Sequence, residues 1–183
     1  CNVCGYKETR NNGKKLAATM KVNAAKLPLK IKQKTTVLKV SGLANGDSVA
    51  SWKSGNTKVV KVSGKPNGTC TLAAGRKKGK TTITIILKSG LKKKITITVQ
   101  KAAVKTAKIT GMPKNLKLKK NQTVTLKAAV APLTSLQKLK YKSSNKKIVT
   151  VTSKGVIKAK KKGKAVITVQ SGSKTVKCKV TVK

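Results

Sequence analysis

The side chains able to do chemistry in this chain are lysines and four cysteines, because histidine is absent and only two residues are acidic. Without histidine the sequence lacks the commonest general base and a frequent metal ligand. Glu8 and Asp47 do not form a pair of catalytic carboxylates. A lysine acting alone as an amine nucleophile would need desolvation or a cationic neighbour to lower its pKa. The composition therefore predicts a protein that is not an enzyme and needs no cofactor.

Cys1 and Cys4 have the spacing of one half of a zinc knuckle. A structural zinc site needs four ligands, usually from two such pairs. The sequence offers no second pair and no histidine, so we expect no metal site within it. Three explanations stay open for the pair: a partner upstream of Cys1, a local disulfide, or lipid modification of Cys1.

Cys70 and Cys178 stand in apolar, strand-like surroundings. Cys70 lies in a Thr-Cys-Thr-Leu segment, and Cys178 takes the place that Ile95 has in an earlier, similar segment. Both positions predict small, buried apolar side chains. The two belong to different halves of the chain, so we expect no disulfide between them, and no histidine is present to activate either thiol.

The chain has 45 Lys and Arg residues and a net charge of +43, far above what solubility requires. Nearly all of these residues are lysines, which are hydrated point charges rather than bidentate readers of phosphate or bases. This surplus predicts a diffuse polyanion-binding surface, although solvated faces and turns would also carry lysine. The densest clusters are Arg76, Lys77, Lys78 and Lys80; Lys92, Lys93 and Lys94; and Lys158, Lys160, Lys161, Lys162 and Lys164.

An internal repeat indicates how these residues are positioned. Residues 52–56 (Trp-Lys-Ser-Gly-Asn) correspond to residues 141–145 (Tyr-Lys-Ser-Ser-Asn), and both are followed by alternating valines. The two halves also end alike, in residues 95–99 and 178–182. The chain is thus predicted to contain an N-terminal remnant or linker (residues 1–15) and two domains (residues 16–100 and 103–183), with a stiff joint between the domains.

The periodicity within each half is that of β-strands. Apolar residues alternate with Lys or Thr over residues 95–99 and 178–182, and Gly, Asn and Ser separate such segments. Helical patterns are nearly absent, and no apolar stretch is long enough to span a membrane. We therefore predict an all-β protein of two tandem immunoglobulin-like sandwiches, without membrane insertion and monomeric.

These motifs resemble the bacterial Ig-like group 2 (Big2) family. The resemblance rests on residues 52–56 and 79–83 in the first half, and on residues 141–145, Gly155 and residues 163–167 in the second. It implies extracellular modules of adhesins, surface-layer proteins or secreted enzymes, without catalytic residues. Residues 1–10 are similar to the second half of a zinc-ribbon-like repeat of Lys-rich surface proteins of gut Firmicutes.

Trp52 and Tyr141 occupy equivalent positions in the two repeats. An exposed aromatic ring at such a position could stack on a sugar. The buried core aromatic of an Ig-like sandwich explains the repetition by folding alone, and we predict that both rings are structural and buried.

The sequence favours a non-catalytic extracellular spacer or adhesion module on the surface or wall of a Gram-positive bacterium. Its expected partners are anionic cell-wall polymers or host surface polyanions. Two alternatives are a basic protein that binds nucleic acid non-specifically and an accessory module of an upstream secreted enzyme. Sequence-specific recognition of nucleic acid is not expected, because stacking aromatics and groove-reading arginines are few.

Overall fold

The computed structural model describes residues 17–183, which form strands and loops and contain no helix. It follows that no helix in this range is long and apolar enough to cross a membrane. The strands are β1 (Lys21–Val22), β2 (Lys26–Lys30), β3 (Lys34–Thr35), β4 (Val40–Ser41), β5 (Val49–Ser54), β6 (Val60–Gly64), β7 (Cys70–Ala74), β8 (Gly79–Leu87), β9 (Lys92–Gln100), β10 (Lys108–Thr110), β11 (Asn115–Leu118), β12 (Thr123–Thr125), β13 (Ala129–Ala131), β14 (Lys140–Ser143), β15 (Val149–Val151), β16 (Val156–Ala159), β17 (Gly163–Ser171) and β18 (Lys174–Val182).

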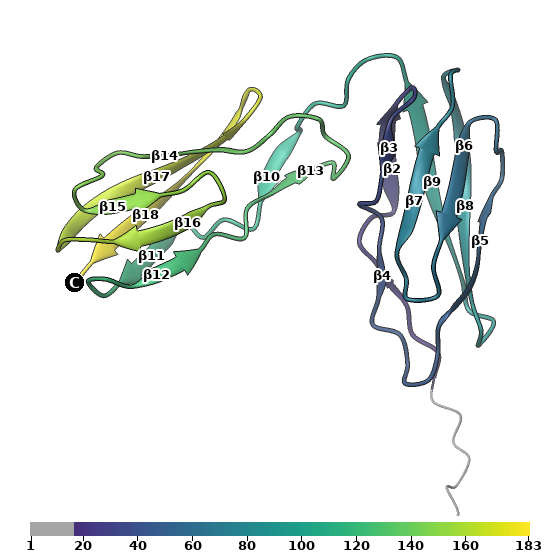
Figure 1. The fold of residues 1–183 in the computed structure, drawn as a ribbon, viewed down its shortest axis with the longest axis horizontal. Helices are drawn as coiled ribbons and strands as arrows, with labels where there is room; N and C mark the ends of the chain where they lie inside the picture. The colour runs from purple at the N-terminus through teal and green to yellow at the C-terminus, as the bar shows by residue number, and fades with distance from the viewer. Residues whose placement is uncertain (1–16) are drawn as a thin grey trace, which may run out of the picture.

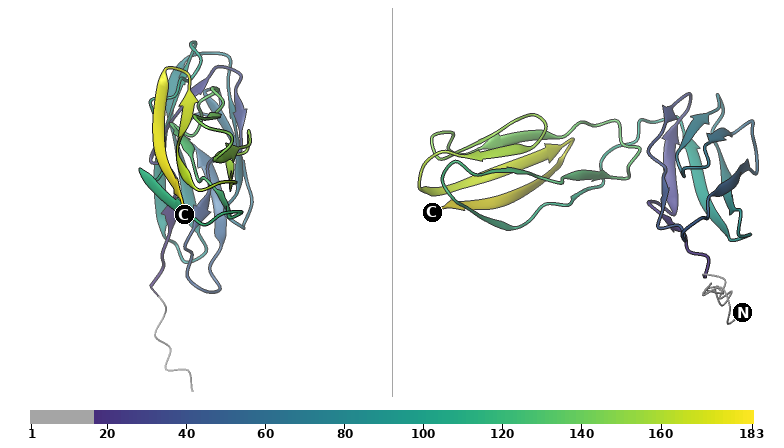
Figure 2. Two further views of the ribbon diagram at one scale, coloured as in Figure 1. Left: turned by 90° about the vertical axis from the view of Figure 1, so that its left-hand side faces the viewer. Right: turned by 60° about the horizontal axis from the view of Figure 1, so that its bottom comes forward.

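The strands form two sandwiches, module 1 (residues 21–100) and module 2 (residues 108–182), which are seen apart in Figure 1 and in the right-hand view of Figure 2. In module 1 a four-stranded sheet, β2-β9-β8-β5, faces a three-stranded sheet, β3-β7-β6. Module 2 repeats this arrangement with β11-β18-β17-β14 and β12-β16-β15. A two-stranded ribbon, β1-β4 or β10-β13, completes each module. Each strand of one module therefore has a counterpart in the other.

The alternating residues of the sequence form the cores. Ile95, Ile97 and Val99 of β9 point between the sheets and are at most 2% exposed, whereas the threonines between them point outward. Cys178 and Val180 take the same places in β18. Because successive side chains of a strand point to opposite faces, this period of two places lysine and threonine on the outside of each sheet.

The first long strand of each module pairs in parallel with the last one. Leu27 and Leu29 of β2 lie beside Ile97 and Val99 of β9, and β11 pairs in parallel with β18 in the same way. The remaining pairs in both modules are antiparallel. An early strand of each module, β2 or β11, thus lies beside the last strand of that module in the four-stranded sheet.

A loop of module 2 contacts module 1 where the two sandwiches are joined. The Thr134 hydroxyl donates a hydrogen bond to the Pro28 carbonyl, and the Gln33 amide donates to the Thr134 carbonyl at 3.0 Å. Leu133 packs against the core of module 1. These contacts lie at the end of module 1 from which the linker runs from β9 to β10 (Figure 1), and they add to the covalent connection between the modules.

Candidate functional site

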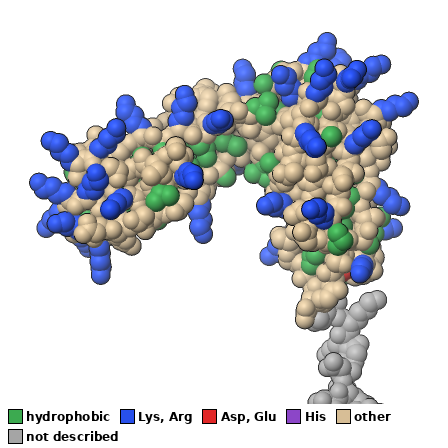
Figure 3. All heavy atoms as spheres, in the orientation of Figure 1, with side chains coloured by type: hydrophobic (Ala, Val, Ile, Leu, Met, Phe, Trp, Pro, Cys, Tyr) green, Lys and Arg blue, Asp and Glu red, His purple; other side chains and the backbone are tan. Residues whose placement is uncertain are grey.

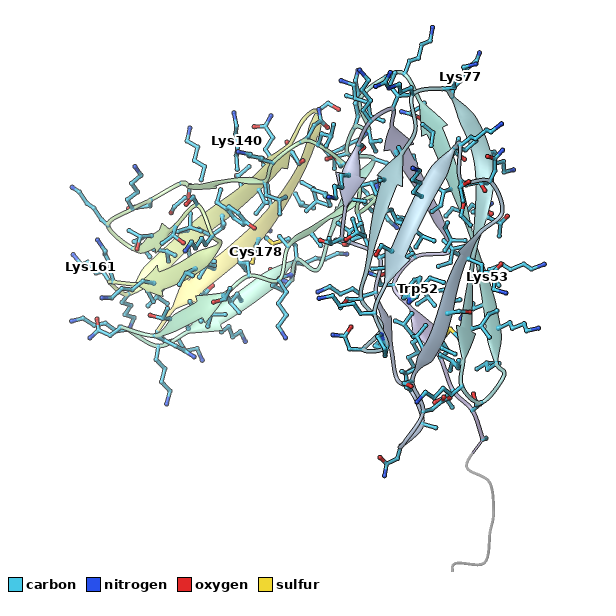
Figure 4. The ribbon with its side chains drawn as sticks, turned by 45° about the vertical axis from the view of Figure 1, so that its right-hand side comes forward. Trp52, Lys53, Lys77, Lys140, Lys161 and Cys178 are labelled. Atoms are coloured by element: carbon cyan, nitrogen blue, oxygen red, sulfur yellow. The ribbon has the colours of Figure 1, made fainter. Side chains whose placement is uncertain are left out.

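The lysine clusters of module 1 lie at opposite ends of the β8–β9 hairpin. Gly79 at the start of β8 pairs with Val99, near the end of β9, whereas Lys92 pairs with Ile86 near the hairpin turn. Arg76, Lys77 and Lys78 precede β8, and Lys77 lies at the upper end of the module (Figure 4). Lys92, Lys93 and Lys94 are exposed in β9 toward the other end. The fold separates two clusters that the sequence places close together.

The cluster at residues 158–164 is distributed over three surfaces of module 2. Lys158 lies in β16 between Thr123 and Thr150, on the outer face of the three-stranded sheet. Lys164 lies in β17 opposite Thr181, in the other sheet. Lys160, Lys161 and Lys162 lie in the turn between these strands, and Lys161 lies at the far end of the module (Figure 4).

The same far end also gathers lysines that lie elsewhere in the sequence. The Asn121 amide donates to the Ala159 carbonyl at 3.0 Å, which holds the loop carrying Lys119 and Lys120 against the turn at residues 160–162. The Lys160 amide donates to the Ile148 carbonyl at 2.7 Å, which brings in Lys146 and Lys147. Only the pairing of the strands reveals this grouping, because strands β12 to β16 separate the first of these three loops from the last along the chain.

The positive charge of the described residues has almost no internal compensation. Within residues 17–183, Asp47 is the single acidic residue. Its carboxylate accepts hydrogen bonds from the Ser89 hydroxyl at 2.7 Å and from the backbone amides of Ser48 and Ser89. The Ser89 hydroxyl, above all, holds the pKa of Asp47 below its usual value. Basic side chains extend from both modules in Figure 3. The described surface therefore carries a positive charge that its own side chains leave almost uncompensated.

Trp52 and Tyr141 are only half-buried, which corrects the prediction that they are buried core residues. Each lies in the outermost strand of its four-stranded sheet, β5 or β14, and points inward against the edge of the core. Trp52 covers Gly64 of the facing sheet, and Tyr141 covers Gly155. A ring on an edge strand has no further strand beside it, so one side stays open to solvent. Their shared role is to close the edge of a sandwich.

Cys70 and Cys178 are free, buried cysteines in the cores of modules 1 and 2. The Cys70 thiol lies 3.6 Å from the Leu38 carbonyl, to which it can donate. Burial raises the pKa of Cys70 to about 11 and also raises the pKa of Cys178. Figure 4 shows Cys178 inside module 2. Both thiols are protonated near neutral pH and poor nucleophiles.

Both buried thiols are expected to resist labelling in the native protein. In a Cys1→Ser/Cys4→Ser variant, reaction with Ellman's reagent at pH 8 should be at least about a hundredfold slower than in urea, because labelling requires opening of the core. The urea-unfolded variant is the control and should expose both thiols at once. Rapid labelling of the folded variant would contradict the placement of these residues.

Residues 17–183 bring together no group of three or more His, Cys, Asp or Glu side chains that could hold a metal ion. The interpretation of Cys1 and Cys4 concerns residues outside the described range. Lysine, serine and threonine side chains of the described residues supply hydrogen bonding and positive charge on the outer faces of the sheets.

Comparison with known families matches residues 103–182 to the bacterial Ig-like domain (group 2). This match and the helix-free, two-layered structure confirm the prediction of an all-β, Ig-like fold. The match covers the half of the chain that contains module 2. In the structure, module 1 has the same order of strands in its sheets.

Among curated proteins, the chain is similar to the kappa-carrageenase of Pseudoalteromonas carrageenovora, with 46% identity over 66 residues. This similarity covers 36% of the chain and 17% of that enzyme. Among solved structures, the chain is similar to domains 5–6 of the S-layer protein SbsC (21% identity, 90% of this chain and 97% of that one, TM-score 0.44) and to human mucin-like protocadherin EC1-2 (8% identity, 91% and 99%, TM-score 0.35).

Proposed function

We propose that this chain is a non-catalytic extracellular module that acts as a spacer or adhesion element on a bacterial surface and holds anionic cell-wall polymers through its lysines. The observation that carries the proposal is the uncompensated charge: lysines extend from both modules, and the carboxylate of Asp47 is engaged by serines. A compact protein that keeps such a charge is destabilised by self-repulsion. A polyanion that neutralises the surface relieves this repulsion.

The distribution of the lysines favours a polymer over a small anion. Each exposed lysine contributes on the order of 1 kcal/mol or less to an ionic contact. Strong binding then requires many contacts with one ligand, whose later contacts benefit from a high effective concentration. Two linked modules with lysines at both ends and on both sheets suit a long, flexible polyanion.

The family match supports an extracellular spacer, because an Ig-like domain of this kind is typically non-catalytic. Two sandwiches in tandem, joined by a short linker, would also separate the protein segments attached to each of them (Figure 1). A Gram-positive wall would supply polymers of the opposite charge, and it is the location that we propose.

Binding to isolated cell walls should depend on wall teichoic acid and on salt. We expect the affinity for cell walls to fall by roughly a hundredfold or more between about 50 and about 200 mM salt. Each contact between a lysine and a phosphate releases counterions, which makes binding sensitive to salt. Sedimentation with walls, before and after removal of teichoic acid, measures this. Equal binding to both preparations, or binding indifferent to salt, would leave the protein as a spacer without a polyanion ligand.

A second candidate is an accessory module of a secreted enzyme. The similarity to a segment of a carrageenase favours it, since that segment is 17% of the enzyme and leaves most of the enzyme unmatched. Fusing residues 1–183 to a polysaccharide hydrolase and measuring retention of the enzyme on insoluble substrate tests this role. Unchanged retention, with teichoic-acid-dependent wall binding, would favour the first proposal.

A further inference from the structure

The outer face of the three-stranded sheet of module 1 is hollowed along its central strand, β7. Two adjoining hollows of ≈ 350 and ≈ 390 Å³ meet at Ser63 and Thr71, which line both. Their floor is made by outward side chains of β7 and of the residue before it, Ala73, Thr71 and Thr69, all of them small. None of the residues that line either hollow is aromatic.

Lysines stand on both sides of this floor at two levels. At one level Lys34 of β3 and Lys61 of β6 are both paired with Ala73. At the other level Lys39 bridges to Thr69, and the Lys65 amide donates to the Thr69 carbonyl at 2.8 Å. These four lysines are exposed and line the hollows. We call this feature the lysine-rimmed groove.

The dimensions of the groove follow from strand geometry. Lys34 and Lys61 are separated by two strand spacings, about 10 Å at their backbones, with only the methyl group of Ala73 between them. Ala73 and Thr69 are four residues apart, about 13 Å along β7. Hydroxyls of Thr71 and Ser63 lie between the two lysine pairs. Two pairs of cations therefore flank a narrow channel with hydrogen-bond donors at its middle.

We propose that the lysine-rimmed groove binds a phosphodiester polymer that runs along β7, with one phosphate between Lys34 and Lys61 and a further phosphate between Lys39 and Lys65. The inference rests on the proposed function and names the place where the polymer is seated. A floor one strand wide suits a slender chain without rings. The absence of aromatic side chains among the lining residues disfavours stacked bases, and hence nucleic acid.

At the corresponding positions, module 2 has the opposite arrangement of long and short side chains. It therefore provides a comparison within the same protein. Its counterpart of Ala73 is Lys158, and the counterparts of Lys34 and Lys61 are Thr123 and Thr150. A long side chain therefore occupies the middle strand, and short ones stand beside it. The groove belongs to module 1, although both modules are rich in lysine.

The substitution Ala73→Lys distinguishes binding of the polymer in the groove from diffuse attraction to the whole surface. It adds a positive charge, which favours diffuse attraction, but its side chain fills the channel. The fold tolerates lysine at the corresponding position of module 2. The matched control is Thr82→Lys, which adds the same charge on the outer face of the four-stranded sheet, opposite Thr96. With purified poly(glycerol phosphate) at low salt, we expect Ala73→Lys to bind on the order of tenfold more weakly than wild type and Thr82→Lys to bind at least as well.

Trp52 offers a direct readout, because its indole N–H donates to the carbonyl of Lys65 at 3.4 Å. Poly(glycerol phosphate) should change Trp52 fluorescence in wild type and in Thr82→Lys, and much less in Ala73→Lys. Circular dichroism melts confirm that all variants fold. Tighter binding by both lysine variants would overturn the groove and leave the proposed function standing. A wild-type protein that does not bind this polymer at low salt would overturn both.

A sulfated polysaccharide and single-stranded DNA of matched charge complete the experiment. The sulfated polysaccharide contains no phosphodiester, whereas single-stranded DNA is a phosphodiester polymer that carries sugar and base rings. A groove for a phosphodiester chain without rings predicts that Ala73→Lys affects these two polymers no more than Thr82→Lys does. A loss for the sulfated polysaccharide equal to that for poly(glycerol phosphate) would overturn the assignment to phosphodiesters, and an equal loss for single-stranded DNA would overturn the preference for a chain without rings.

Discussion

Replacing Gly64 by alanine is expected to destabilise module 1 by about 1–3 kcal/mol, the cost of forcing a packed aromatic ring out of its place. A β-carbon at this position would lie 2.0 Å from Cδ1 and 2.3 Å from Cγ of Trp52, so the indole ring would have to leave its place. Moving the ring also breaks the hydrogen bond from the indole to the Lys65 carbonyl. Unfolding in urea at fixed salt, followed by Trp52 fluorescence, measures the loss. Urea is preferable to guanidinium because an ionic denaturant would also screen the lysine charges.

Gly55→Ala is the matched control for this substitution. Gly55 lies in the same module, and its added β-carbon would meet the Thr82 carbonyl oxygen at 3.4 Å, an ordinary contact. We expect a change within about 0.5 kcal/mol. In a Trp52→Ala background, Gly64→Ala should become nearly neutral, as measured by circular dichroism. A full loss of stability in that background would show that the ring is not what makes glycine necessary.

Replacing Gly111 by alanine is expected to destabilise module 2 by about 3 kcal/mol or more, from backbone strain and a clash together. Gly111 has φ of 75°, which alanine adopts at a cost, and its added β-carbon would lie 2.0 Å from the Lys127 carbonyl oxygen. The clash is with backbone, so no side chain can rotate away. Unfolding of module 2, followed by circular dichroism, should shift strongly to lower temperature, while the unfolding of module 1 that Trp52 fluorescence reports should stay in place.

Gly90→Ala isolates the cost of the backbone conformation. Gly90 has φ of 87°, but an added β-carbon there would meet nothing within 4 Å. We expect a loss of about 1–2 kcal/mol, the penalty for alanine in the left-handed region. If Gly111→Ala lowered the free energy of unfolding by no more than Gly90→Ala does, the close approach to Lys127 would contribute nothing to the loss of stability.

The sequence by itself determined the local structure and the chemical character of this protein. Alternation at residues 95–99 and 178–182 predicted strands with one buried face, because only a period of two puts Ile95, Ile97 and Val99 on the same side. The repeat centred on Trp52 and Tyr141 predicted two similar units, and the excess of lysine predicted an anionic partner. Burial of Cys70 and Cys178 also follows from such local patterns, since each replaces an inward apolar residue.

Only the tertiary structure decided which of these residues act together. Register between strands set Lys34 and Lys61 on either side of Ala73, although the two lysines are far apart in the chain and stand in no dense cluster. It also separated Lys158 from Lys164, which are neighbours in sequence but lie in different sheets. The position of β5 at the edge of its sheet left Trp52 only partly buried. Side-chain direction is local and can be read from a periodic pattern, whereas strand order and register depend on contacts between distant segments, which the pattern within one segment does not encode.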